Sequence, residues 1–430
     1  MSWEVYIEWR GQSCLVGRLH AAERGPNVSF EYAPDWLKRP GAFAVDPTSL
    51  PLQAGAQHSP VLFGAMADCG PDRWGRILIE RAVRKNVLAQ KPYRDVDYVL
   101  ALDDSSRLGA LRFRVDAASP FLAVSTGKLP PLIRLQALMR AADAIHSETD
   151  TAADLRFLLG AGSPLGGARP KSAVSLPDGR LALAKFPKPD DTRDIAGGEI
   201  LALTLAAEAG ISVVEHRLVP VGKHSVAVIT RFDRVGSDRI PFVSGASLLG
   251  LARGEPGAYT MLADAIRQFG DDVAGDLREL WRRMVFSLLA SNYDDHLRNH
   301  GFLMREPGRW SLCPAYDLNP VPEIDRGRMS KTPISEEGED VSIDGVLAVA
   351  GRFGIKEPAA KSILREVFTA VAGWRQTARR LRLKGATVEA YASAFEHELM
   401  DEARRLLSPV TRASGRPSRK RSGISTSRLP

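Results

Sequence analysis

The pattern of hydrophobic positions predicts a long helix that ends at a polar loop. Between residues 277 and 289, apolar residues recur at i, i+3, i+4 and i+7, and charged residues fill the opposite face. This period is typical of an amphipathic helix packed on a core. The polar stretch 291–302 follows directly. We therefore expect a rigid helix to hold this loop in place, which suits a catalytic group.

Alternating and β-branched segments predict strands earlier in the chain, and helical patterns dominate its end. The predicted strands are 5–9, 14–19, 173–176, 180–186 and 226–230, and the predicted helical segments are 63–88, 133–146 and 340–407. The turn Pro177-Asp178-Gly179 joins two of these strands, as expected for a hairpin. The 430 residues leave room for two to three packed domains.

The composition is that of an ordinary globular protein, with 44% hydrophobic and 25% charged residues. The three cysteines are far apart and form no C-x-x-C motif, which predicts neither a zinc knuckle nor a disulfide framework. The N-terminus has no basic and apolar leader. No apolar run approaches the ~20 residues that a membrane span needs. We therefore predict a cytoplasmic protein without membrane contact.

The net charge of +7 is concentrated at the C-terminal end. Residues 408–430 contain six Arg and Lys residues and no acid, so the rest of the chain is close to neutral. This Ser-, Pro- and Arg-rich tail cannot form a core and is predicted to be disordered. Two interpretations of it stay open: contact with nucleic acid or an acidic partner, and a solvated end.

An acid pattern typical of phosphoryl transfer occupies the polar loop. Asp294 and Asn299 have the spacing of a kinase catalytic loop, and Asp317 lies downstream. In a kinase, the first carboxylate takes or orients the proton of the acceptor hydroxyl. The Asn and the second Asp hold Mg²⁺ on the phosphates. The alternative is a polar turn rich in Asn and Asp.

A glycine-rich run at residues 160–172 opens the predicted hairpin. Its spacing excludes a P-loop, which leaves a plain loop or a flexible loop that covers nucleotide phosphates. Lys185 on the next strand and Glu199 in the next helix follow the order of a kinase N-lobe. The strand 226–230 then enters a predicted interlobe hinge. There we expect Phe232 to pack on adenine and Asp233 to accept from a ribose hydroxyl.

Short motifs occur in a fixed order along residues 1–405. In the first part they are Tyr32-Ala33-Pro34-Asp35-Trp36-Leu37, Leu50-Pro51-Leu52 and Pro71-Asp72-Arg73-Trp74-Gly75-Arg76. Later they are Gly167-Ala168-Arg169-Pro170-Lys171, Lys185-Phe186-Pro187, Arg231-Phe232-Asp233-Arg234, residues 292–299 and Tyr316-Asp317. Together they resemble the HipA family, the toxin kinases of type II toxin–antitoxin modules.

This resemblance implies an α+β, two-lobed protein-kinase-like fold with an added N-terminal α/β subdomain and a mostly helical C-lobe. The implied regions are a HipA-like N-terminal subdomain (1–115), an N-lobe-like region with the glycine-rich loop (116–234), a helical C-lobe-like region (235–407) and the basic tail (408–430). Residues 1–115 show no acid–base constellation, so we interpret them as a packing or assembly module.

The implied activity is that of a Ser/Thr protein kinase that uses ATP and Mg²⁺. Asp294 matches the catalytic base, and Asn299 and Asp317 match the metal ligands. The implied nucleotide-site residues are Lys185, Glu199, Gly166, Gly167, Lys171, Arg231, Phe232, Asp233 and His296. Of these, His296 is expected to stabilise the catalytic loop by hydrogen bonding. Ser163 is the candidate for the self-phosphorylated serine of the family's glycine loop.

The resemblance also implies partners. Members of the family are neutralised by a small helix-turn-helix antitoxin (HipB-like) that binds operator DNA, and some phosphorylate an aminoacyl-tRNA synthetase. In this chain, Arg169-Pro170 stands where the best-known members have Gln-Glu, so the contacts of the glycine loop are expected to differ.

Three alternatives stay open. The D-x-H-x-x-N spacing from Asp294 to Asn299 also fits a small-molecule or lipid kinase. A regulator with a degenerate active site is opposed by the intact Lys185, Asp294, Asn299 and Asp317. A metal site built from His296, His300 and Cys313 is the weakest of the three.

Overall fold

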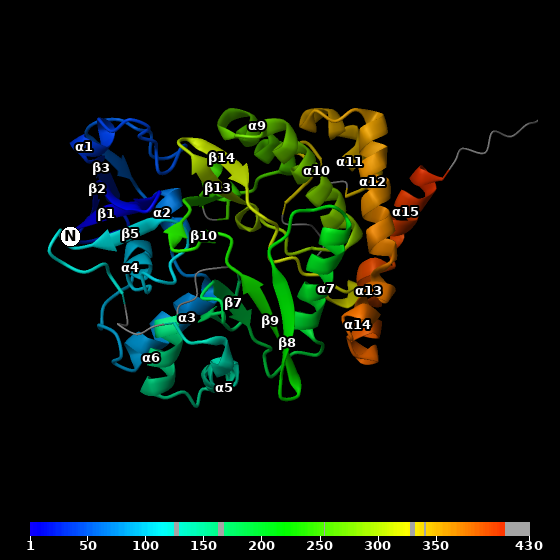
Figure 1. The fold of residues 1–430 in the computed structure, drawn as a ribbon, viewed down its shortest axis with the longest axis horizontal. Helices are drawn as coiled ribbons and strands as arrows, with labels where there is room; N and C mark the ends of the chain where they lie inside the picture. Colours follow the sequence, from blue (N-terminus) through cyan, green and yellow to red (C-terminus); the bar gives the residue numbers. More distant parts are fainter. Residues whose placement is uncertain (124–128, 162–166, 253, 327–331, 339–340, 409–430) are drawn as a thin grey trace, which may run out of the picture.

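The computed structural model describes residues 1–123, 129–161, 167–252, 254–326, 332–338 and 341–408. Three groups of elements follow one another along the chain (Figure 1). They are an N-terminal antiparallel sheet, a four-stranded sheet with its helices, and a mostly helical C-terminal part. Among the described residues, no helix is both long and apolar enough to cross a membrane. The predicted α+β architecture is confirmed.

The N-terminal sheet has the strand order β4-β3-β2-β1-β5. Its strands are β1 (Ser2–Trp9), β2 (Gln12–Ala21), β3 (Val28–Tyr32), β4 (Ala56–Ser59) and β5 (Leu111–Arg114). Helices α1 (Pro34–Leu37), α2 (Gly64–Asp68), α3 (Arg73–Arg84) and α4 (Asp95–Leu100) lie between β3 and β5 along the chain, and α3 packs against α6 near the middle sheet. Arg10 and Gly11 both have positive φ, as a tight turn between twisted strands requires. The predicted first hairpin is confirmed.

The middle sheet has the order β6-β7-β9-β8, and all its neighbours are antiparallel. Its strands are β6 (Lys171–Ser175), β7 (Leu181–Lys185), β8 (His216–Val221) and β9 (His224–Thr230). Helices α5 (Leu135–His146) and α6 (Ala152–Ala161) precede the sheet, and α7 (Ile195–Glu208) follows β7. The hairpin predicted around residues 177–179 is confirmed.

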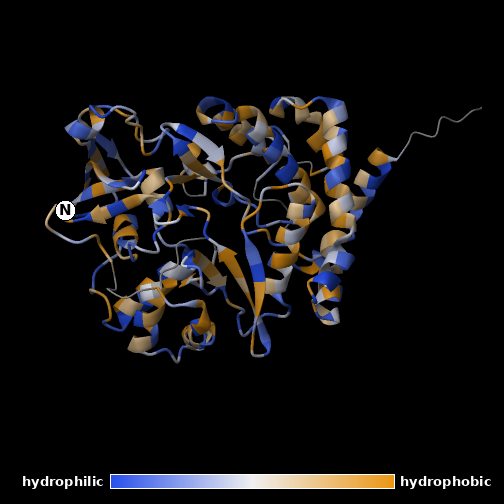
Figure 2. Ribbon diagram, in the orientation of Figure 1, coloured by the Kyte–Doolittle hydropathy of each residue, from blue (hydrophilic) through white to orange (hydrophobic). Residues whose placement is uncertain are grey.

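Side chains of β9 alternate between two cores, as the two-residue period of a strand predicts. Val226 and Val228 pack with apolar residues of α3, α5 and α6, whereas Ala227 and Ile229 join the larger core that includes α7. Both faces are therefore apolar, and Figure 2 shows the β9 arrow as largely hydrophobic. The sheet is thus held from both sides, which fixes the end of β7.

The C-terminal part is built around the predicted long helix, which is α10 (Val273–Leu289). It packs against α9 (Tyr259–Phe269) and α12 (Glu357–Ala372), with Trp281 fully buried. The remaining elements include α8 (Gly245–Leu248), α11 (Ile343–Ala348), α13 (Trp374–Arg380), α14 (Gly385–Phe395), α15 (Glu398–Leu407), and the strands β10 (Arg234–Val235), β11 (Asp238–Arg239), β12 (Phe242–Ser244), β13 (Gly301–Glu306) and β14 (Arg309–Leu312). After α10, Ser291 adopts a positive φ of 50°, which turns the chain out of the helix.

Candidate active site

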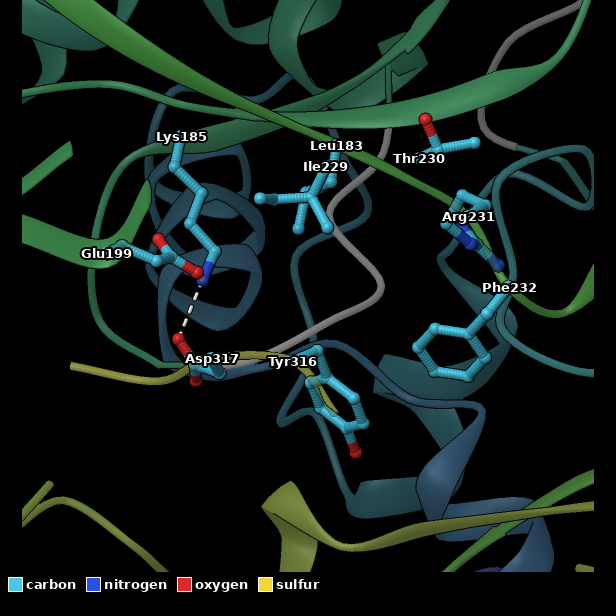
Figure 3. A pocket seen from close by; sticks show the side chains of 9 residues that line it. All are labelled: Leu183, Lys185, Glu199, Ile229, Thr230, Arg231, Phe232, Tyr316 and Asp317. Atoms are coloured by element: carbon cyan, nitrogen blue, oxygen red, sulfur yellow. Dashed lines mark hydrogen bonds and ion pairs between the residues drawn. The ribbon is translucent and has the colours of Figure 1, made fainter. Parts of the chain in front are cut away.

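Lys185, at the end of β7, joins two carboxylates that are far apart in the sequence. Its Nζ lies 2.5 Å from Glu199 Oε1 on α7 and 2.6 Å from Asp317 Oδ1 (Figure 3). All three residues belong to the predicted site, and the structure brings them together. Lys185 and Glu199 are 7% and 3% exposed, so the contacts are shielded from water.

The charges of this cluster stabilise one another. Burial alone would lower the pKa of Lys185, but the carboxylates of Asp317 and Glu199 outweigh burial and hold that pKa above its ordinary value. Burial alone would raise the pKa of Asp317, but the neighbouring Lys185 holds it below its usual range. Burial raises the pKa of Glu199 despite the ammonium beside it. The lysine is therefore a fixed cation, and Asp317 is a fixed anion.

The Asp294 loop, which we define as residues 292–300, follows α10 and ends in the 3-10 turn Leu297–Asn299. Asn299 Nδ2 donates to the main-chain oxygen of Asp294 at 3.1 Å, which closes the loop. Asp294 is exposed, whereas the adjacent Asp295 is only 2% exposed. Of the two aspartates, Asp294 is therefore the one that lies at the surface. Asp295 was not among the predicted site residues.

Hydrogen bonds tie the Asp294 loop to the Asp317 segment. Tyr316 donates its hydroxyl to Arg298 O at 2.7 Å, and Asn319 N donates to Asn292 Oδ1 at 2.9 Å. Asn319 Nδ2 also donates to Asp317 Oδ1 at 3.1 Å. Asp317 has a φ of 57°, a left-handed conformation that aspartate tolerates better than most residues. The predicted metal ligands Asn299 and Asp317 thus sit on two segments that are held together.

A pocket lies beside the lysine. Its lining residues are Leu183, Lys185, Glu199, Ile229, Thr230, Arg231, Phe232, Tyr316 and Asp317 (Figure 3). Phe232 and Tyr316 stack with ring centroids 5.2 Å apart and an interplanar angle of 28°. The pocket therefore has an aromatic end at the hinge and a charged end at Lys185, which suits a ligand with a planar ring and an anionic group.

The predicted ribose contact of Asp233 is wrong. Its side chain is fully buried, with Oδ1 and Oδ2 each 2.6 Å from the Arg231 guanidinium, and Oδ2 also accepts from Gly109 N at 2.7 Å. Arg234 binds the same carboxylate. Burial alone would raise the pKa of Asp233, but Arg231 and Arg234 hold it below its ordinary value. Phe232, in contrast, lines the pocket, and its predicted contact with adenine stays a prediction.

Arg231 is used in a way that the sequence did not predict. Its guanidinium donates to the main-chain oxygens of Ser106 and Arg107 at 2.9 and 3.3 Å, both in the segment that leads into β5. Its side chain is 1% exposed, although other atoms of the residue border the pocket. The hinge is therefore anchored to the N-terminal region by its charged residues.

The predicted nucleotide contact of Lys171 is also wrong. Its side chain is fully buried, and Nζ is ion-paired with Asp72 Oδ2 and donates to Gly167 O at 3.0 Å. Trp74 Nε1 donates to Lys171 O at 3.0 Å. The first residues of α3 thus hold the start of β6. This ion pair is structural, and the sequence analysis did not predict it because Asp72 and Lys171 are 99 residues apart.

The remaining predicted residues have mixed outcomes. Gly166 and Ser163 lie outside the described residues. Gly167 has a φ of 82° and accepts a hydrogen bond from Trp74 N at 3.3 Å. His296 contributes its main-chain oxygen, which accepts from Asn299 N at 2.7 Å. Its buried Nδ1 has no hydrogen-bond partner among the described residues, so the expected side-chain support of the loop is not observed.

The alternative metal site of His296, His300 and Cys313 is wrong. In the part of the chain that the structure describes, no three His, Cys, Asp or Glu side chains are grouped to hold a metal ion. His300 Nε2 instead lies 3.0 Å from Asp295 Oδ1, and Cys313 is fully buried.

Comparison with known proteins shows partial sequence matches to curated relatives. A provisionally named kinase of Haemophilus influenzae is 28% identical over 187 residues, which cover 39% of this chain and 54% of that protein. The provisionally named kinase Y4dM of Sinorhizobium fredii is 31% identical over 144 residues, which cover 30% of this chain and 34% of that protein. The chain thus spans about half and a third of the lengths of these two relatives.

The overall fold also has a solved counterpart. HipA of the Shewanella oneidensis MR-1 toxin–antitoxin system, solved in a complex with HipB and operator DNA, has a TM-score of 0.69 at 17% identity. The match covers 94% of this chain and 97% of that one, and at this identity it shows the fold alone.

Two family models match the sequence. The HipA N-terminal domain matches residues 9–113, and the HipA-like C-terminal domain matches residues 163–374. Together the two models cover most of the chain, with the N-terminal domain before the C-terminal domain. The chain therefore belongs to the HipA family.

Proposed function

We propose that the protein is an ATP- and Mg²⁺-dependent Ser/Thr protein kinase that acts in the cytoplasm as the toxin of a toxin–antitoxin module. One observation carries this proposal. Lys185 bridges Glu199 and Asp317 at the charged end of a pocket whose other end is aromatic. This is the arrangement that phosphoryl transfer requires, with a fixed cation for the phosphates and a carboxylate for the metal.

The donor set fits Mg²⁺. Asn299 and Asp317 offer an amide and a carboxylate oxygen, and hard cations prefer oxygen ligands. Mg²⁺ is usually bound through one or two protein groups together with substrate phosphates, so a protein-only cluster of three ligands is not needed. When bound, Mg²⁺ would neutralise charge on the phosphates.

The side chains of the chain itself then have separate roles. Phe232 and Tyr316 offer aromatic surface to adenine at the hinge. Lys185 neutralises phosphate charge, and Glu199 keeps its ammonium in place. Asp294, exposed at the loop, takes or orients the proton of the acceptor hydroxyl.

The biological role is proposed from family membership. The Shewanella oneidensis relative was solved with HipB and operator DNA. By analogy, we propose a small HipB-like helix-turn-helix antitoxin that brings the complex to operator DNA, and a protein substrate such as an aminoacyl-tRNA synthetase.

The experiment is expression of the chain alone, beside Lys185→Ala and the matched control Lys223→Ala. Lys223 is an exposed lysine in the turn between β8 and β9. Wild type and Lys223→Ala should arrest growth and transfer the γ-phosphate of ATP to lysate protein. Lys185→Ala should do neither. Transfer to small alcohols in place of protein would instead favour a small-molecule kinase, and equal toxicity of all three would mean that arrest does not depend on this site.

A further inference from the structure

The Asp294 loop contains a buried polar cluster that the proposed function does not use. The hydroxyl of Tyr259, the first residue of α9, donates to Asp295 Oδ2. His300 Nε2 lies 3.0 Å from Asp295 Oδ1. One oxygen of Asp295 thus accepts a hydrogen bond from another element. The other lies beside an imidazole whose two nitrogens have no hydrogen-bond partner among the described residues.

The cluster is closed and well shielded. Tyr259, Asp295 and His300 are 2%, 2% and 4% exposed, and the rings of Tyr259 and His300 meet edge to face at 5.1 Å. The main-chain oxygen of Asp295 accepts from Thr332 Oγ1 at 3.0 Å. Tyr259 N in turn donates to Pro333 O at 3.0 Å, so the tyrosine itself is fixed.

A buried carboxylate needs donors, because desolvation without partners is costly. Burial and the nearby Asp295 carboxylate raise the pKa of Tyr259 well above its ordinary value. The phenol therefore remains protonated and keeps donating. Loss of this donor favours any rearrangement of the loop that returns Asp295 to water.

A small pocket adjoins the cluster, and its walls include Asn292, Tyr293, Asp295 and Tyr259. Space without atoms supplies no packing contacts. Hydrogen bonds therefore contribute to holding this side of the Asp294 loop, beside the packing of its side chains.

We propose that Tyr259 anchors Asp295 and thereby sets the position of the adjacent Asp294. The proposal rests on the proposed kinase function, because it assigns Tyr259 and Asp295 as positioning residues for phosphoryl transfer. Neither of them needs to touch a substrate. A displacement of about 1 Å at a catalytic group can cost about a hundredfold in rate.

The test uses the full-length protein and measures amide hydrogen exchange of residues 292–300 beside steady-state kinetics. In Tyr259→Phe we expect exchange in this segment to rise about tenfold, as one lost buried hydrogen bond allows. The kcat should fall by about tenfold to a hundredfold while the KM for ATP moves less than about twofold. Asp295→Asn keeps an oxygen acceptor for Tyr259. It should therefore change the exchange of residues 292–300 and the kcat less than Asp295→Ala does.

Tyr32→Phe is the matched control, because Tyr32 is equally buried and donates to Leu50 O at 2.8 Å far from the loop. It should leave kcat and the exchange of residues 292–300 unchanged. If residues 292–300 of Tyr259→Phe exchange as slowly as in wild type, the anchor proposal is wrong. If Tyr259→Phe does not fold, the same result in Asp295→Ala rules the proposal out. If the wild-type protein transfers no phosphate, the proposed function fails, and the exchange comparison still decides whether the cluster holds the loop.

Discussion

Two buried clusters of three charged residues have opposite compositions and also differ in what surrounds them. At the pocket, Lys185 holds Glu199 and Asp317. At the hinge, Asp233 is held by Arg231 and Arg234. The first cluster borders a cavity, whereas the carboxylate of the second is enclosed by guanidinium groups and a backbone N–H. Both clusters contain residues that the sequence analysis assigned to the nucleotide and metal sites.

This difference indicates which charged residues can bind a ligand and which stabilise the fold. A charged group that faces a pocket can exchange its protein partner for a ligand. A charged group whose oxygens are all occupied inside the protein cannot do so without leaving buried charges unpaired. We therefore assign the Lys185 cluster to phosphoryl transfer and the Asp233 cluster to the attachment of the hinge to the N-terminal region.

The largest expected effect is that of Asp317→Asn. This change removes the charge of a proposed metal ligand and keeps its shape. We expect phosphoryl transfer to fall by about a thousandfold or more, since several kcal/mol of charge stabilisation are lost. Circular dichroism and a melting curve should show an intact fold. The exposed Asp178→Asn serves as the control, and near-wild-type turnover of Asp317→Asn would refute the assignment.

Asp294→Asn should lower kcat by about a hundredfold to ten-thousandfold, the usual contribution of a general base. ATP binding, measured by calorimetry, should stay within about twofold because the group acts on the acceptor. If Asp295→Asn were inactive and Asp294→Asn active, the roles of the two aspartates would have to be exchanged.

Asp233→Asn should act on stability and not on chemistry. Removing one partner of a buried charge cluster costs about 3–5 kcal/mol, because two guanidinium groups lose their counter-charge. Urea unfolding should show this loss, while turnover per folded molecule stays within about threefold of wild type. If Asp233→Asn were as stable as wild type and bound ATP more weakly, the result would support the predicted ribose contact and contradict the structural role.

The smallest effect concerns pH. The pKa of Asp233 in the folded protein lies below its ordinary value, so its ionised form stabilises the fold above about pH 4. This stabilisation is lost as the pH falls from there through the folded pKa. The stability difference between wild type and Asp233→Asn should therefore be constant near neutral pH and shrink below about pH 4. A difference that grows in acid would contradict the assignment.

The local elements could be predicted because they depend on neighbouring residues. The period of α10, the turn between β6 and β7, and the order from Lys185 to Asp317 were all visible in the sequence. The order of motifs also indicated the family correctly. These features need no knowledge of distant contacts.

What could not be predicted is which charged residues find distant partners. Asp72 meets Lys171 across 99 residues, and Arg231 meets Ser106 across 125. Lys171 and Arg231 both belong to motifs that suggested a bound nucleotide. The side chains of both are instead bound by groups of the protein itself. Asp294 was chosen over Asp295 for its spacing to Asn299, and no local pattern indicated that Asp295 accepts a hydrogen bond from Tyr259, 36 residues away on α9.

The most direct test of the distinction between the two clusters is one paired measurement. Transfer of γ-phosphate from labelled ATP to lysate protein is compared for Asp317→Asn and Asp233→Asn, at equal concentrations of folded protein. The two-cluster account predicts transfer within about threefold of wild type for Asp233→Asn and no detectable transfer for Asp317→Asn. Equal loss in both variants, or an active Asp317→Asn beside an inactive Asp233→Asn, would contradict it.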